Sequence, residues 1–479
     1  MPDALTELPP PARRPIAAGR LETVTARQAI GQFAGRAGTG IEIVSGDRVV
    51  GSGTVAPGPD GLQRFAIPLP EGEALAGSRS PLRARTVDGR DLSGLERVPL
   101  PVGRPAKALV MIPAGQVYDH DKARLYEKTL TGTYANIGDM MVYESTLRMF
   151  DFSALRPLEI TEPTQSRIDL YNAEYDFVFL RGSNFIHEST NFRRATEVLD
   201  RLKIPVIAAG VGAQAVTRRK IVLPPEPLRV WNAIADRCAT IGVRGAYSAE
   251  VLWDNGIRNV EVVGCPSIFR ARDPEMRLRR VAPDAVKKVA FSLRRETGHN
   301  YSRNVADYLS VQKATMLRLD RETDLTVTVH GELEERAFAL RQEDRIEAAT
   351  EELRRRRWFT PEDEEQMLRI YRDRLFFYKT GQEYDDFVRQ QDMTIGYRVH
   401  GVLPALANGT PSILVDYDER SAELANTHRI PLVTEEDLRD RPWRELYAEA
   451  RFDAFEEEFR WGYARMKAHL DRNGIPNRM

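Results

Sequence analysis

Residues 392–416, DMTIGYRVHGVLPALANGTPSILVD, predict a strand, a tight turn, a helix and a second strand in close succession. The apolar runs at the two ends are typical of short buried strands. Between them, residues 401–407 have a helical pattern, and Pro404 is expected in the first turn, where a missing N–H does no harm. Strands joined by a helix in this way build parallel α/β sheets.

Arg398 and His400 fall where the first of these strands ends and the helix begins. In open parallel sheets, ligands bind outside the carboxyl ends of the strands, and a helix N-terminus attracts anions. Arginine can hold a carboxylate or phosphate through two hydrogen bonds, and histidine exchanges protons near neutral pH. The pattern therefore predicts an anion site with a titratable group beside it. A purely structural role for both residues stays open.

Composition and charge exclude several classes of protein. A chain of 479 residues exceeds one compact core, so two or three domains are expected. The formal net charge of −1 gives no global field that would draw the protein to nucleic acid. Two cysteines without a CxxC motif suggest neither a disulfide framework nor a metal site. Without a signal-peptide pattern or a membrane-spanning apolar run, a cytoplasmic location is expected.

The pattern of predicted secondary structure changes along the chain. Short β-like runs separated by Gly, Asp and Pro turns fill the region before residue 100, and strands alternate with helical stretches afterwards. The fold class is thus α/β, with two facing doubly wound domains that contain parallel sheets and follow a small all-β sandwich. We predict a disordered N-terminus (1–17), the β-sandwich (18–100), an N-terminal α/β domain (106–275), a C-terminal α/β domain (280–435) and C-terminal helices that pack back across both (436–479).

Polar or glycine-rich residues follow several other predicted strands, and parallel strands bring such ends to one edge of a sheet. Arg244 ends a strand and precedes a glycine, which lets a ligand approach the backbone. Gly212 belongs to half of a phosphate-binding fingerprint, which a tight turn explains better. Asp139 suits a helix start, whereas His187 and Glu188 form either an acid–base pair or an exposed polar pair. Each candidate keeps a structural alternative.

The ordered set of these motifs resembles the polysaccharide pyruvyl transferase family over residues 131–431. The matching pieces are Asn136-Ile137-Gly138-Asp139, Gly210-Val211-Gly212, residues 243–252, Gly264-Cys265-Pro266, Tyr397-Arg398-Val399-His400, Gly409-Thr410-Pro411 and residues 416–431. The resemblance implies a GT-B-like fold and an enzyme that uses phosphoenolpyruvate as its donor, with no cofactor and no metal. It implies transfer of a pyruvyl group to a sugar diol of a cell-surface or exopolysaccharide glycan, or of its precursor.

The resemblance also assigns roles to residues of this sequence. His400, Arg398 and Arg244 are expected to be catalytic, and the donor is expected to contact Arg244, Arg398, Val399 and His400. The expected acceptor-side residues are Asn136, Gly138, Asp139, Ser183, Asn184, His187, Glu188 and Gly212. His400 is the candidate acid that protonates the donor methylene, and Asp139 or Glu188 could accept protons from the acceptor hydroxyls.

Two other functions stay open at this point. A GT-B glycosyltransferase with a nucleotide-sugar donor would need a carboxylate for the ribose hydroxyls, for which Glu423 is the candidate. A non-catalytic glycan-binding protein would rely on the β-sandwich. The expected partners are phosphoenolpyruvate and a glycan or lipid-linked oligosaccharide acceptor, with peripheral association with a membrane-bound glycan assembly machinery. A homo-oligomer is left open, and nucleic acid is not expected.

Overall fold

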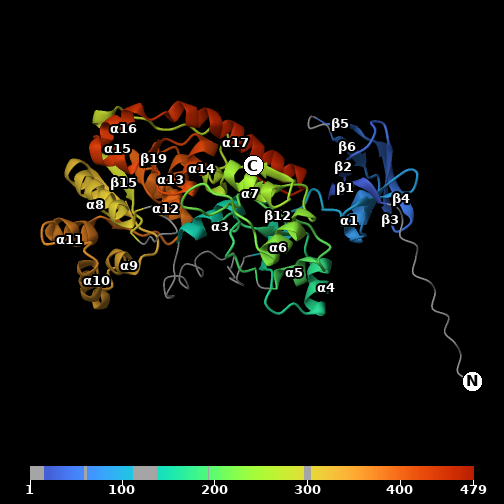
Figure 1. The fold of residues 1–479 in the computed structure, drawn as a ribbon, viewed down its shortest axis with the longest axis horizontal. Coiled ribbons are helices and arrows are strands. Elements are labelled where there is room, and N and C mark those ends of the chain that lie inside the picture. Colours follow the sequence, from blue (N-terminus) through green and yellow to red (C-terminus); the bar gives the residue numbers. More distant parts are fainter. Residues whose placement is uncertain (1–15, 59–61, 112–136, 193, 296–301, 303) are drawn as a thin grey trace, which may run out of the picture.

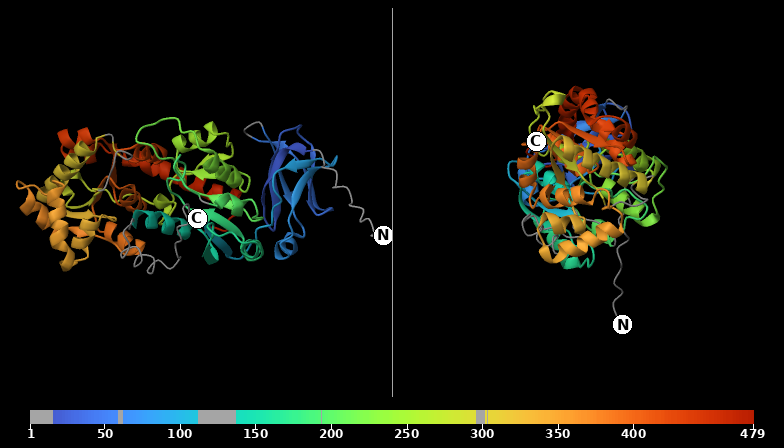
Figure 2. Two further views of the ribbon diagram at one scale, coloured as in Figure 1. Left: turned by 60° about the horizontal axis from the view of Figure 1, so that its bottom comes forward. Right: turned by 90° about the vertical axis from the view of Figure 1, so that its left-hand side faces the viewer.

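The computed structural model describes residues 16–58, 62–111, 137–192, 194–295, 302 and 304–479. Its β-rich N-terminal part lies at one end of an elongated molecule, followed by two α/β units (Figure 1). Figure 2 shows the same order from a second direction, with the β strands at one end and the helices of the second unit at the other. The mixed α/β class with parallel sheets is confirmed.

The second α/β unit (residues 288–433) contains a six-stranded parallel sheet in the order β17-β16-β15-β18-β19-β20. The order reverses between β15 and β18, and such a switch point is where open α/β sheets bind ligands. The strands are β15 (Lys288–Ser292), β16 (Asp324–Thr328), β17 (Leu375–Phe376), β18 (Met393–Gly396), β19 (Ser412–Val415) and β20 (Leu432–Val433). The helices are α8 (Val305–Glu322), α9 (Leu333–Ala339), α10 (Glu343–Arg355), α11 (Glu364–Asp373), α12 (Gly381–Val388), α13 (Val399–Ala407) and α14 (Glu419–His428).

Residues 392–416 contain β18, α13 and β19, and the two strands pair in parallel. The helix begins two residues earlier than expected, at Val399, so Pro404 lies inside it rather than in its first turn. Proline has no N–H to donate to the carbonyl four residues earlier, which belongs to His400. Every residue of α13 is buried, and this packing offsets the lost hydrogen bond.

The first α/β unit (residues 106–262) has the parallel order β10-β9-β11-β12, and a bridge between Val211 and Val243 continues it to β13 and β14. Both parallel units share one continuous hydrophobic core. The strands are β9 (Ala106–Met111), β10 (Phe152–Pro157), β11 (Phe177–Leu180), β12 (Val206–Ala208), β13 (Ile241–Val243) and β14 (Val260–Val262). The helices are α3 (Ile137–Met149), α4 (Gln165–Glu174), α5 (Ala195–Leu199), α6 (Pro225–Ala235) and α7 (Ala246–Asp254).

Helix α3 joins the two units. The Ile137 N–H donates to the His330 carbonyl of the second unit at 3.0 Å. At the other end, Arg148 Nη1 lies 2.8 Å from Asp385 Oδ2 on α12. All residues of α3 except Asp139 and Arg148 are buried, so neither face of this helix is open to solvent along its length. Its second face is covered by the other unit, which no local pattern could indicate.

A buried ion cluster fastens this junction. Arg270 follows the short 3₁₀ helix Pro266–Phe269 and is 1% exposed. Its Nε and Nη2 donate to the two carboxylate oxygens of Asp385 at 2.6 and 2.8 Å, and its Nη1 donates to Ser145 Oγ of α3 at 2.8 Å. Two hydrogen bonds join the charges of Arg270 and Asp385, and these bonds offset the desolvation penalty of burying both groups.

The N-terminal β part differs from the predicted sandwich. All eight strands belong to one hydrogen-bonded sheet, β4-β3-β7-β8-β1-β2-β6-β5, with a separate core. The sheet curls so that β4 lies against β6, as shown by Gly51 and Gly53 of β4, where an added Cβ atom would touch Ile67 of β6. The strands are β1 (Ile16–Val24), β2 (Gln28–Phe33), β3 (Gly40–Ser45), β4 (Arg48–Thr54), β5 (Ala56–Pro57), β6 (Gln63–Pro68), β7 (Arg83–Thr86) and β8 (Asp91–Ser93), with helix α1 at Gly72–Gly77.

The start of the β sheet corrects the boundary at residue 17. Ile16 and Ala17 already belong to β1 and pair with Asp91 and Leu92 of β8. These pairs give the backbone of the two residues partners in the sheet, although the sequence before them is rich in proline. The rest of the segment expected to be disordered, residues 1–15, lies outside the described residues.

Arginines dock the β sheet on the first α/β unit. Arg79 Nε donates to the Asn172 carbonyl in the last turn of α4 at 2.7 Å, and Arg97 donates to the Asp236 carbonyl that follows α6. Arg20 Nη2 donates to the Ala239 carbonyl at 2.5 Å. The last carbonyls of a helix have no helical partner and carry partial negative charge. Guanidinium groups are therefore suitable caps for these helix ends.

The C-terminal region forms α15 (Glu435–Asp440), α16 (Trp443–Glu449) and α17 (Phe452–Arg472). Helix α17 crosses back over both units (Figure 1). On it, His469 Nε2 lies 3.2 Å from the Ala208 carbonyl of β12, and the Arg472 carbonyl accepts from Thr23 Oγ1 of the β sheet at 2.6 Å. Among the helices of the described residues, none combines the length and apolar character needed to cross a bilayer.

Candidate functional site

Arg398 lies at the switch point of the second sheet. It caps α13, directly after β18, and its Nε donates to the Leu293 carbonyl at the end of β15 at 3.1 Å. Its Nη2 forms an ion pair with the fully buried Glu332, which precedes α9. The side chain of Arg398 is 14% exposed. One buried carboxylate therefore balances this guanidinium, which lies at the carboxyl ends of the neighbouring strands β15 and β18.

His400 links the two α/β units. Its side chain lies in the first turn of α13 and is buried. Its Nδ1 is 3.4 Å from the Gly138 carbonyl of α3, and its Nε2 is 3.0 Å from Nη2 of Arg420 on α14. A guanidinium can only donate, so Nε2 must accept, and the proton of the neutral imidazole resides on Nδ1.

The surroundings of His400 are strongly cationic. Burial lowers the pKa of His400 well below its ordinary value of 6.5, and the charges of Arg420, His330, Arg398 and Arg244 lower it further. The pKa of His330 is also lowered well below 6.5, by burial and then by Arg398 and Arg294. His400 is therefore uncharged at neutral pH in the free protein, in a place suited to an anion.

Arg244 reaches this region from the first unit, directly after β13. It is 3% exposed. Its Nε donates to Glu423 Oε2 of α14 at 2.8 Å, while Nη1 and Nη2 donate to Asn184 Oδ1 and to the Ala213 carbonyl. Arg244 is thus fixed between the units and lies close enough to His400 for its charge to affect that pKa.

Several of the predicted acceptor-side residues gather around Arg244 and the start of α3. Gly212 lies against the Arg244 guanidinium, and the Ser183 carbonyl accepts from the Gly212 N–H at 2.9 Å. Asp139 lies in the first turn of α3, with Oδ2 3.8 Å from Nη2 of Arg181. Asn136, which precedes this helix, lies outside the described residues.

His187 and Glu188 have a different environment. His187 Nδ1 is 2.8 Å from Ser189 Oγ, and Glu188 accepts two hydrogen bonds from Arg219 at 2.7 and 2.8 Å. The hydrogen bonds from Arg219 lower the pKa of Glu188, which makes this carboxylate a weaker base. In the described part of the chain, neither residue contacts His400, Arg398 or Arg244, so the structure does not bring this pair to the arginine–histidine corner.

A sequence profile of the family described as polysaccharide pyruvyl transferase matches residues 136–419, which is more than half of the chain. The chain belongs to the polysaccharide pyruvyl transferase family. The resemblance drawn from the motifs is thereby confirmed, and the family indicates a transferase. No curated protein has a detectably similar sequence.

Solved structures give only a distant likeness to this transferase. A putative UDP-N-acetylglucosamine 2-epimerase from Listeria monocytogenes has a TM-score of 0.38 at 11% identity, covering 78% of this chain and 99% of its own. The UDP-GlcNAc 2-epimerase of Methanocaldococcus jannaschii has a TM-score of 0.36 at 13% identity, covering 71% and 91%. At such scores the likeness carries no argument about the activity of this transferase.

Sequence reasoning missed two residues that surround His400, Arg420 and His330. Arg420 is the second residue of α14, after the capping residue Asp418, and His330 follows β16. Both therefore stand at the carboxyl edge of the second sheet, and the rule that ligands bind at this edge could have found them. Their contact with the His400 region depends on packing between segments that are distant in sequence.

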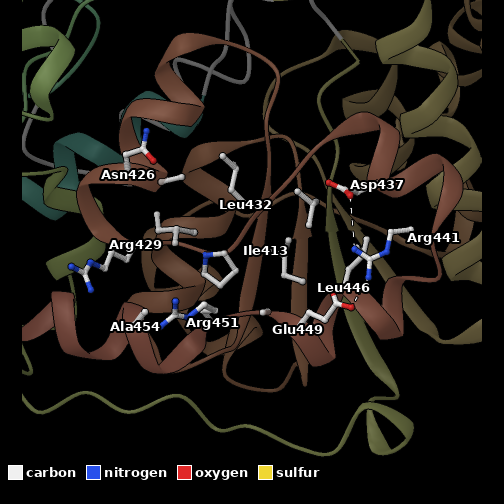
Figure 3. Close-up of a pocket in the computed structure, with 15 residues that line it drawn as sticks. Ile413, Asn426, Arg429, Leu432, Asp437, Arg441, Leu446, Glu449, Arg451 and Ala454 are labelled. Carbon is white, nitrogen blue, oxygen red and sulfur yellow. Dashed lines mark hydrogen bonds and ion pairs between the residues drawn. The ribbon is translucent and has the colours of Figure 1, made fainter.

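Two cavities of the transferase lie apart from His400. A groove of about 490 Å³ lies between the end of α14, β20 and the C-terminal helices (Figure 3). Arg441 on its wall pairs with Glu449 at 2.7 Å, so this charge is already balanced.

A second cavity, of about 360 Å³, lies between α7 and α14 and is lined by Tyr247 and Glu419. Burial raises the pKa of Glu419, which makes it a candidate base. Within the described residues, no group of three or more His, Cys, Asp or Glu could hold a metal ion.

Proposed function

We propose that this transferase moves a pyruvyl group from phosphoenolpyruvate to a sugar diol of a cell-surface or exopolysaccharide glycan, or of its lipid-linked precursor. The observation that carries the proposal is the uncharged, buried His400 surrounded by Arg420 and Arg398 from the second unit and Arg244 from the first. Among the described residues, Glu332 and Glu423 pair with Arg398 and Arg244 and no carboxylate pairs with Arg420, so a small donor with a carboxylate and a phosphate would balance the charge of Arg420. The two parallel units on either side of α3 support a GT-B-like arrangement for this site.

The donor is expected to be held by charge and by helix ends. Arg398 and Arg244 can each direct remaining N–H groups at an anion, and the N-terminus of α13 adds free backbone N–H groups at Val399 and His400. The fixed partners Glu332 and Glu423 orient the two guanidiniums in advance. Orientation before binding favours the transition state because the reaction then requires little reorganisation.

The chemistry balances with one proton transfer to carbon. Once His400 has taken up a proton from solvent, it transfers this proton to the donor methylene, which becomes a methyl group, and C2, which becomes electron-poor, is attacked by the first sugar hydroxyl. The second hydroxyl then attacks C2 as the C–O bond to phosphate breaks. Of the two hydroxyl protons, one restores His400 and the other leaves with inorganic phosphate, so the products are a cyclic pyruvate ketal and phosphate.

The carboxylate that removes these hydroxyl protons is assigned to the acceptor side. Asp139 is the candidate because it lies in the first turn of α3, next to the Gly138 carbonyl that faces His400. Its side chain is 28% exposed, so it is accessible to a hydroxyl. Glu188 is less suited, because Arg219 already holds both of its oxygens.

The proposal is tested by incubating the full-length protein with phosphoenolpyruvate and candidate free or lipid-linked oligosaccharides. Phosphate release together with a pyruvyl mass gain on the glycan is expected, and both should be lost in His400→Gln. Arg429→Gln is the control, because Arg429 follows α14 rather than α13, is 57% exposed, and among the described residues forms ion pairs only at 3.9 and 4.0 Å. A glycan that gains a sugar from a nucleotide sugar, with no pyruvyl transfer, would overturn the proposal.

The glycosyltransferase alternative meets a specific obstacle. It assigns Glu423 to the ribose hydroxyls, but Oε2 of this carboxylate accepts from Arg244 at 2.8 Å and Oε1 accepts from the Ser248 N–H at 2.6 Å. Melting temperatures measured with phosphoenolpyruvate and with nucleotide sugars separate the two functions, since only a ligand of the folded state raises the melting temperature.

A further inference from the structure

Arg420 differs from the other arginines at the switch point. Glu332 pairs with Arg398 and Glu423 pairs with Arg244, whereas the described residues place no carboxylate within ion-pair distance of Arg420. Its Nε is buried and has no hydrogen-bond partner in that part of the chain. The one hydrogen bond of its guanidinium to a described residue is the 3.0 Å contact with His400 Nε2.

This contact has a direct chemical consequence for His400. The nitrogen that Arg420 occupies is Nε2, and the other nitrogen faces the Gly138 carbonyl. In the free protein, neither nitrogen can present an acidic proton to a ligand unless one contact opens. The contact with Gly138 is backbone and comes from a packed helix, whereas the contact with Arg420 comes from a long side chain with an unsatisfied donor.

We propose that Arg420 is a donor-operated cap on His400, an inference that rests on the proposed function. In the free protein, Arg420 holds Nε2 and keeps the imidazole neutral with its proton on Nδ1. When the donor anion binds, the guanidinium turns to the phosphate or carboxylate and releases Nε2. The imidazole then takes up a proton from solvent at Nε2 and becomes the acid that protonates the donor methylene.

The charges around His400 support this coupling. The groups that face it are Arg398 at the start of α13, Arg420 on α14, His330 after β16, Arg244 after β13 and the Gly138 carbonyl of α3. All the side chains in this set disfavour a proton on His400, so its pKa is low while the site is empty. A bound anion offsets these positive charges and favours the protonated form of His400, so the acid forms only when there is a donor to protonate.

The first test measures the tautomer and the pKa of His400 in the free protein, and this measurement does not depend on turnover. The full-length protein is labelled with ¹⁵N-histidine, and His400→Gln identifies the signals of His400 among the seven histidines. The wild type is expected to show a neutral imidazole with the proton on Nδ1. In Arg420→Gln, the pKa of His400 should rise and the tautomer with the proton on Nε2 should appear, whereas the control Arg429→Gln should leave both unchanged.

The second test adds phosphoenolpyruvate, or inorganic phosphate as a probe. In the wild type, the bound anion should protonate His400 at a pH where the free protein is neutral. Arg420→Gln should bind the anion about 10- to 100-fold more weakly, the scale of one lost charge-assisted hydrogen bond. Arg420→Lys, which keeps the charge but has a single donor group, should restore the low pKa in part.

The outcomes separate this inference from the proposed function. An unchanged tautomer and titration of His400 in Arg420→Gln, or a wild type with its proton on Nε2, would overturn the cap. So would bound anion that leaves His400 neutral. If phosphoenolpyruvate does not bind, the proposed function fails, and the free-protein measurement still decides whether Arg420 sets the tautomer. If Arg420→Gln fails to fold, the same spectra are recorded on Arg420→Lys, where a changed Nε2 signal is expected.

Discussion

Replacing Gly212 by alanine tests the placement of Arg244 without removing a charge. A Cβ atom at this position would lie 2.3 Å from Arg244 Cζ and 2.4 Å from its Nε. Ordinary contacts between carbon atoms are about 3.5–4.0 Å, so the guanidinium must move by about 1 Å or more. It cannot do so while it keeps its bonds to Glu423, Asn184 and Ala213. Overpacking of this kind costs about 1–3 kcal/mol of stability, and a misplacement of 1 Å near the reacting groups can cost about 10²-fold in rate.

The assay for Gly212→Ala combines thermal unfolding with phosphate release that depends on phosphoenolpyruvate and acceptor. Gly77→Ala is the control, because a Cβ atom there meets nothing within 4 Å, and it lies at the end of helix α1, outside the α/β units. The control should keep its activity and gain up to about 1 kcal/mol in stability. If Gly212→Ala retains both the melting temperature and the rate of the wild type, the reasoning about Arg244 is refuted.

Further changes probe the buried junction, the acid and the docking of the β sheet. Asp385→Ala leaves Arg270 buried with its main partner removed, so urea unfolding should show a loss of about 3–5 kcal/mol; a loss below about 1 kcal/mol would contradict the role of the cluster. Burial raises the pKa of Asp385, but the hydrogen bonds and charge of Arg270, with Arg148 and Asn408, lower it overall. The stability that Asp385 contributes should therefore be present above about pH 4 and disappear as the pH falls below it, so the gap between wild type and Asp385→Ala should narrow in acid. His400→Gln should reduce the rate by about 10²–10⁴-fold while binding of phosphoenolpyruvate, measured by calorimetry, persists; an unchanged rate would remove His400 from the mechanism. Arg97→Ala leaves the Asp236 carbonyl without this cap and should lower the free energy of unfolding of the β sheet, docked on the first α/β unit, by about 1–3 kcal/mol, as measured by calorimetry. An unchanged transition would mean that water replaces the guanidinium.

The sequence allowed the central unit of the fold to be predicted because its signals are local. The apolar runs of β18 and β19 and the residues between them specify a strand, a helix start and a second strand within a few turns of chain. The place of Arg398 and His400 at a sheet edge followed from that pattern. The predicted start of α13 was two residues too late, because Pro404 was expected in the first turn. The helix accommodates Pro404 in its interior because it is stabilised by burial on all sides.

The remaining features depend on packing between distant segments. Arg244 and Glu423 are 179 residues apart in sequence, and Arg270 and Asp385 are 115 apart, so neither pair has a local signature. Helix α3 is buried on both faces because it lies between the units, and the β strands close into one curled sheet instead of two. Arg420 was overlooked because a residue just after a helix cap has the sequence appearance of an exposed first-turn side chain.

The arginine caps of the β sheet have a consequence for how freely the adjoining surface can change. Arg79, Arg97 and Arg20 bind main-chain oxygens at Asn172, Asp236 and Ala239, and every amino acid carries that oxygen. The side chain of Asp236 is exposed and can therefore be substituted without loss of this contact, as long as α6 still ends in the same place, whereas Ala239 is buried and the side chain of Asn172 binds Arg201 and Lys203. Lengthening or shortening α4 or α6 by one residue would break the hydrogen bond to the arginine, because the accepting oxygen would rotate away by about 100°. The attachment thus constrains the lengths of these helices, while the composition of their buried faces is constrained by packing.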